Sequence, residues 1–120
     1  MNVTFNTKQE GVFHFLYLQR KSDYIGICLN LNIIEYGKDL KRLEGSLEEA
    51  AFSHLEAVRK GNLDDKYLNT SAPKKYWDRY FAECKRVEKI EKIIKDATPT
   101  NWGSLGNSEF FTFTQRPYFA

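Results

Sequence analysis

The chain has 120 residues, of which 42% are hydrophobic, and its formal net charge is +2. This length suits one domain with a hydrophobic core, and so small a net charge predicts neither a nucleic-acid nor a membrane partner by itself. No run of about 18 apolar residues is present, so no membrane-spanning helix is expected in these 120 residues. The first residues lack a basic stretch followed by an apolar one, which predicts no signal peptide and a cytoplasmic location.

Three strands are expected in the first third of the chain. Residues 12–18 are dense in aromatic and branched side chains, and residues 24–31 alternate between apolar and mixed positions, which is typical of a strand with one apolar face. The polar residues 19–23 between them predict an antiparallel hairpin. A shorter strand is expected at 33–36, and 3–5 could add a short edge strand.

A capping box predicts the start of the first helix. Ser46 and Glu49 have the S-x-x-E spacing in which the two side chains satisfy each other's backbone N–H groups. The helix should therefore run from about Leu47 to Lys60, after a charged connection over 38–44. Its buried stripe is expected at Leu47, Ala51, Leu55 and Val58. Gly61 is expected to end the helix in a left-handed conformation.

The second half of the chain predicts one more helix and one more strand. Residues 62–72 form a polar linker with one helical turn near 63–68. A second helix is expected at 74–95, with an apolar stripe at Tyr76, Tyr80, Cys84, Val87, Ile90 and Ile94. Residues 98–108 are typical of a loop, and 109–115 of a final strand that Pro117 ends.

This β-β-β-α-α-β order predicts a single α+β domain over residues 1–120. We expect an antiparallel sheet of about four strands with both helices on one face. The core would be the β-β-β-α unit at 12–61. The helix at 73–96 would be added to it, and 109–115 would supply the last strand.

Residues that could carry catalysis or hold a metal are scattered. A nucleophile needs a base within hydrogen-bond reach, and the only histidines are His14 and His54, both in apolar segments. They are interpreted as structural residues, unless they meet a carboxylate in one cleft. Cys28 and Cys84 are expected as reduced, buried thiols, with a disulfide as the alternative. We expect no enzyme, no metal and no cofactor.

The second helix carries the main charge asymmetry. From Lys74 to Lys95 there are eight basic and four acidic residues. Four of the basic residues share one side of the helix: Lys75, Arg79, Arg86 and Lys89. This row could follow a phosphate backbone or meet an acidic protein patch, and the alternative is an ordinary solvated face that Asp78 weakens.

Aromatic residues outside the predicted helices allow two further hypotheses. Tyr17, Tyr24 and Tyr36 could stack bases from the sheet, although packing is the alternative. Trp102 and the segment 116–119 are unusually apolar for a loop and a chain end, so the end segment is expected to pack on the domain or across a dimer.

Residues 12–58 resemble the HicB-like antitoxin family. The resemblance lies in the second strand at 24–31 and in the helix entry Gly-Ser-Leu-Glu-Glu-Ala at 45–50. It implies a sheet of three antiparallel strands, a helix and a fourth strand, in which the second helix would be an insertion. It also implies a domain that self-associates, with a homodimer as the expected form, and that neutralises a small RNA-cleaving toxin. The DNA-binding segment of many family members is not visible here.

The expected function is therefore that of a non-catalytic protein-interaction module that binds a small protein partner. The first alternative is a nucleic-acid-binding protein that uses the basic second helix. A further alternative is an accessory protein of a mobile element.

Overall fold

The computed structural model describes residues 5–96 and 111–119. Its elements in chain order are β1 (Glu10–Gln19), β2 (Tyr24–Cys28), β3 (Ile33–Gly37), α1 (Leu40–Lys60), the 3₁₀ turn η1 (Asp65–Leu68), α2 (Lys74–Asp96) and β4 (Phe111–Phe119). The loop predicted at 98–108, with Trp102, lies outside the described residues. So do the start of the last predicted strand, at 109–110, and most of the edge strand predicted at 3–5.

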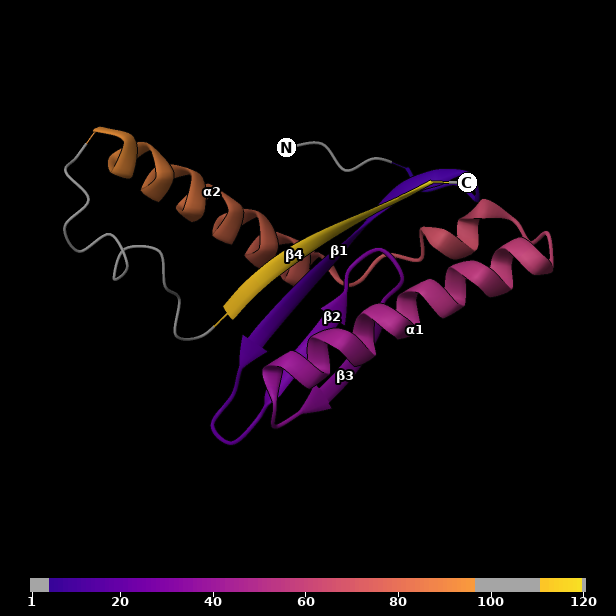
Figure 1. Ribbon diagram of the computed structural model, residues 1–120, viewed down its shortest axis with the longest axis horizontal. Helices are drawn as coiled ribbons and strands as arrows, with labels where there is room; N and C mark the ends of the chain where they lie inside the picture. The colour runs from indigo at the N-terminus through magenta and orange to yellow at the C-terminus, as the bar shows by residue number, and fades with distance from the viewer. Residues whose placement is uncertain (1–4, 97–110, 120) are drawn as a thin grey trace.

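The four strands form one antiparallel sheet in the order β3-β2-β1-β4 (Figure 1). The α+β class and the β-β-β-α-α-β order are confirmed. β1 is central and pairs with β2 on one side and with the whole length of β4 on the other. β3 and β4 are the two edges of the sheet.

The two helices cover opposite faces of the sheet, so the prediction that both lie on one face is wrong. One core cluster joins Phe13, Phe15 and Tyr17 of β1 to α1, and a second joins Leu16 of β1 to Tyr80 of α2. Figure 1 shows α1 in front of the sheet and α2 behind it. The physical reason lies in β1, whose side chains are apolar on both faces and would expose one apolar face to water if the helices shared a side.

α1 begins at Leu40, seven residues before its predicted start at Leu47. Asp39 is the residue that caps it, because its side chain accepts the backbone N–H of Arg42 at 3.1 Å. The predicted connection over 38–44 is therefore mostly helix. Ser46 lies inside the helix and donates its hydroxyl to a carboxylate oxygen of Glu35 in β3 at 2.6 Å, so the capping box does not form.

The end of α1 has the predicted position and an unexpected conformation. Gly61 follows the last helical residue, but its φ is −82°, so it does not form a left-handed stop. The left-handed residue is Asn62, with φ of 46°. Asparagine tolerates this conformation better than most side chains, and the glycine continues the helical backbone by donating its N–H to Ala57 at 3.0 Å.

β2 is shorter than predicted because the chain turns after Cys28. Leu29 and Leu31 are both buried, but they lie in the turn that leads to β3. Leu29 packs in the cluster on the α2 side and Leu31 in the cluster on the α1 side, so they do not share the face that the alternation predicted. Asn32 has φ of 55° and completes this turn. The apolar residues of the alternation at 24–31 are buried, but Gly26, Cys28 and Asn30 between them are buried as well, so the predictions of a single apolar face and of the strand length are both wrong.

β4 runs through Pro117, which was predicted to end it. Pro117 lies opposite Val12, whose own N–H points away from β4 and is accepted by the Asn6 side chain at 2.9 Å. At this position the backbone of β4 faces the outer edge of the sheet, so the missing proline N–H removes no ladder bond. The end segment packs on the domain through Tyr118, which is buried and donates its hydroxyl to the carbonyl oxygen of Thr7, whereas Phe119 is 72% exposed.

Candidate interaction surface

The basic row predicted on α2 divides into two parts. Lys75, Arg79 and Lys89 are exposed, whereas Arg86 is partly buried and makes a two-pronged ion pair with Glu83, with contacts of 2.6 and 3.0 Å. Because the side chain of Glu83 is only 2% exposed, this pair is held at the helix surface and the charge of Arg86 is compensated. The predicted row therefore does not act as four equivalent cations.

Arg79 is the member of the row that meets other parts of the chain. It lines a groove of about 530 Å³ together with residues from β1, β2, β3 and the start of α2: Leu18, Gln19, Arg20, Ile25, Tyr36 and Tyr76. Lys75, one turn earlier, has its ammonium nitrogen 5.0 Å from the centre of the Tyr76 ring. The groove thus has an apolar floor, tyrosine sides and cations on its rim.

Arg20 is fixed in place at the hairpin end of this groove. It makes two hydrogen bonds to the Asp23 carboxylate, of 2.7 and 2.6 Å, across the turn that joins β1 to β2. Its guanidinium carbon also lies 4.7 Å from the centre of the Tyr36 ring. The hydrogen bond from Arg20 lowers the pKa of Asp23, so this pair stays ionised at neutral pH.

The edge strand β3 borders the same groove. Ile34 is 38% exposed and Tyr36 is 58% exposed, and both side chains lie on the face of the sheet that α2 covers only in part. Glu35, between them, points to the other face, where it accepts the Ser46 hydroxyl. An open apolar strip and a groove with a cationic rim are therefore adjacent. We call them together the β3 surface.

The three tyrosines considered for base stacking do not share a face. Tyr17 is buried in the core cluster between the sheet and α1, and Tyr24 is partly buried against that cluster. Tyr36 alone is widely exposed and lies on the opposite face. A row of stacking rings along the sheet is therefore absent from these positions.

The two histidines do not converge. His14 is buried between β1 and α2, where its ring makes an edge-on contact with Tyr80. Burial lowers its pKa, and the nearby side chain of Asn30 opposes this effect only in part. His54 lies on α1, on the other side of the sheet, and its Nε2 is 2.7 Å from the carbonyl oxygen of Tyr67. The single cleft that an enzyme would need from these two residues is not formed.

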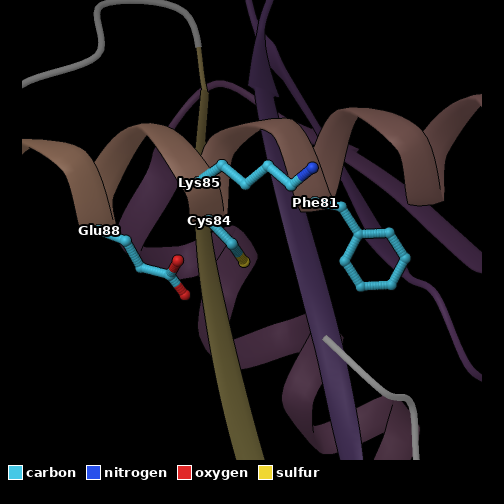
Figure 2. A pocket seen from close by; sticks show the side chains of 4 residues that line it. All are labelled: Phe81, Cys84, Lys85 and Glu88. Carbon is cyan, nitrogen blue, oxygen red and sulfur yellow. The ribbon is translucent and has the colours of Figure 1, made fainter.

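The two cysteines are free thiols on opposite faces of the sheet. Burial raises the pKa of the Cys28 thiol to about 12, and it also raises that of Cys84. Cys84 lines a pocket of about 250 Å³ together with Phe81, Lys85 and Glu88 of the same helix. Figure 2 shows these four side chains. A thiol with a raised pKa is the reverse of an activated nucleophile.

Within residues 5–96 and 111–119, no three side chains of His, Cys, Asp or Glu are grouped so that they could hold a metal ion. No helix in the same part of the chain has the length and apolar character needed to cross a bilayer.

Comparison of the chain with protein-family models, with curated proteins and with solved structures found no match. The β3 surface must therefore be interpreted from its own chemistry. Sequence reasoning identified Arg79 and weighed Tyr36, but it missed Arg20, Ile34 and the role of Tyr76. Arg20 looked like an ordinary turn residue, and only the pairing of β2 with β3 brings it to Tyr36.

Proposed function

We propose that this chain is a non-catalytic protein-interaction module, resembling the HicB-like antitoxins, that binds a small protein partner. The observation that carries the proposal is the open β3 surface, where Ile34 and Tyr36 are exposed beside the groove. Exposed apolar side chains that form a patch with a polar rim are typical of protein-binding sites. The β-β-β-α segment over β1 to α1 also has the element order that the resemblance implies.

The test is a pull-down of tagged protein from extract of its native cells, with and without nuclease, followed by mass spectrometry. The surface variant is the double substitution Ile34→Glu and Tyr36→Glu. The matched control is Leu63→Glu and Tyr67→Glu, because these side chains are similarly exposed, at 42% and 44%, and are not part of the β3 surface.

We expect a small protein that binds the wild type and the control, survives nuclease, and is lost with the surface variant. Loss of all protein partners after nuclease, with recovery of nucleic acid, would contradict the proposal and favour the alternative that uses the basic helix. Circular dichroism of each variant checks that the fold is kept. The homodimer that the resemblance implies stays a prediction, which light scattering after size-exclusion chromatography tests.

A further inference from the structure

The backbone of β3 directs a regular set of polar groups outward. The N–H of Leu29 donates to the carbonyl oxygen of His14 at 2.8 Å. From this bond and the strand register, Ile25 and Ile27 are the residues of β2 whose backbone groups bond to β1. Because the direction of backbone hydrogen bonds alternates along a strand, the N–H and C=O groups of Gly26 and Cys28 point to β3. Their partners in β3, Glu35 and Ile33, point their backbone groups to β2. The N–H and C=O groups of Ile34 and Tyr36 therefore point to the open edge.

The edge at β3 lacks the protection that the other edge has. Natural edge strands are usually blocked by proline, by inward charges or by a covering segment. β4 carries Pro117 at an outward-facing position, whereas β3 has no proline, and its one charged residue, Glu35, is engaged with Ser46 on the α1 face. Among the described residues, none hydrogen-bonds to the outward backbone groups of Ile34 or Tyr36.

The charge around the groove favours an acidic occupant. The groove and the segments beside it carry six basic residues, Arg20, Lys21, Lys38, Lys74, Lys75 and Arg79, and four acidic ones, Asp23, Glu35, Asp39 and Asp78. Two of these acids are already engaged in ion pairs, Asp23 with Arg20 and Asp78 with Lys74. A positive potential therefore remains beside an apolar floor.

We propose that β3 binds an extended segment of the partner protein as a fifth strand, with an acidic side chain of that segment placed at the cationic rim of the groove. This inference rests on the proposed function and names how the partner is bound. Backbone bonds would supply affinity, and alternate side chains, which all point to one face, would supply specificity.

Two other occupants fit the edge less well. A nucleic-acid backbone offers phosphate acceptors but not the alternating donors and acceptors that Ile34 and Tyr36 require. In a second copy of this chain, full overlap of the two β3 strands would place Glu35 opposite Glu35, and like charges directly opposite destabilise a strand pair.

The experiment uses two synthetic seven-residue peptides with blocked ends, in which Val alternates with Glu or with Lys, titrated into ¹⁵N-labelled protein. We expect the Glu peptide to shift the amide signals of Ile34 and Tyr36, and the Lys peptide to bind about ten-fold more weakly, as the loss of a charge-assisted contact implies. Equal binding of both peptides, or no shift at β3, would overturn the proposal.

A proline substitution separates the edge from the rest of the surface. Ile34→Pro removes one outward N–H without removing a bond to β2, just as Pro117 is accommodated in β4. Ile34→Thr is the matched control, because it keeps the N–H while shortening the apolar side chain. Binding of the Glu peptide should be lost with proline and kept with threonine. Equal binding by both variants would contradict strand addition.

The outcomes also distinguish this inference from the proposed function. If a partner from the pull-down binds the Ile34→Pro variant as well as the wild type, the interaction module stands and the added strand is wrong. If a single-stranded oligonucleotide, and neither peptide, shifts the groove residues, both proposals give way to nucleic-acid binding.

Discussion

The side chain of Asn69 pairs with the backbone of Asn6 as a neighbouring strand would. Its Oδ1 accepts the N–H of Asn6 at 2.9 Å, and its Nδ2 donates to the Asn6 carbonyl at 2.8 Å. The Asn6 side chain in turn donates to Leu68 at 3.3 Å and accepts from Val12. These bonds join the segment before β1 to η1, which lies more than sixty positions further along the chain.

Replacing Asn69 with alanine should lower the free energy of unfolding by about 1–3 kcal/mol, because the backbone groups of Asn6 lose both partners in a partly buried site. Urea unfolding followed by circular dichroism measures the change. Thr70→Ala is the matched control, since Thr70 is adjacent and exposed. Equal effects of the two substitutions would show that the pairing contributes nothing.

The stability of the protein should fall at mildly acidic pH because of His14. Its folded pKa lies below the ordinary value of 6.5, so the unfolded chain binds the proton more readily than the folded one. The stabilisation is complete above pH 6.5 and is lost as the pH falls from there through the lower folded pKa. The surroundings of the ring include Asn30, Trp77 and Tyr80, and none of these three carries a compensating negative charge at that pH.

Urea unfolding between pH 7.5 and pH 5 measures this dependence. The wild type and His54→Gln should lose stability together over this range, and His14→Gln should lose less. A pH dependence that is the same in all three proteins would show that His14 does not titrate on unfolding.

The position of the helix cap can be tested with two substitutions. Asp39→Ala should lower stability by about 1 kcal/mol, because it removes the acceptor of the Arg42 N–H. Ser46→Ala should change stability by less than about 0.5 kcal/mol, because the hydroxyl makes only an exposed hydrogen bond and alanine favours the helix interior. Thermal unfolding compares them, and the reverse order would restore the capping box as the helix start.

Two buried tyrosines should respond differently to the loss of their hydroxyls. The Tyr118 hydroxyl donates to Thr7 at 2.7 Å, whereas the hydroxyls of Tyr17 and Thr114 are buried without a partner at hydrogen-bond geometry. Tyr118→Phe should therefore cost about 1 kcal/mol, and Tyr17→Phe should be neutral or stabilising. Chemical unfolding of both variants checks this, and a large loss from Tyr17→Phe would reveal a hydrogen bond to Thr114.

Local patterns in the sequence were enough to predict the sheet and the order of its elements. The apolar stripe of α1 is a short-range signal that marks buried residues correctly, whereas the alternation in β2 indicated one buried face and the strand is buried on both. The start of α1 was missed because the prediction relied on the pattern at Ser46, whereas the structure caps the helix at Asp39 and buries Leu43 of its first turn in the core.

The position of the second helix and the binding surface could not be read from local patterns. The apolar run from Val12 to Leu18 in β1 does indicate burial on both faces of the sheet, and it therefore favours one helix on each face. The groove is different, because Arg20, Tyr36 and Arg79 come from three separate elements. Their proximity depends on strand register and on helix placement, which no spacing along the chain encodes.

The pairing of β1 with β4 has a consequence for synthesis on the ribosome. β1 is translated before the other described strands, yet one of its two neighbours is β4, the last of them, with Glu10 opposite Phe119. Until β4 emerges, the backbone groups along one edge of the aromatic strand β1 have no partner strand, and such an open edge is prone to aggregation. Slow translation of the α2 region would lengthen this exposure, so the yield of folded protein should depend on the time between the synthesis of β1 and that of β4.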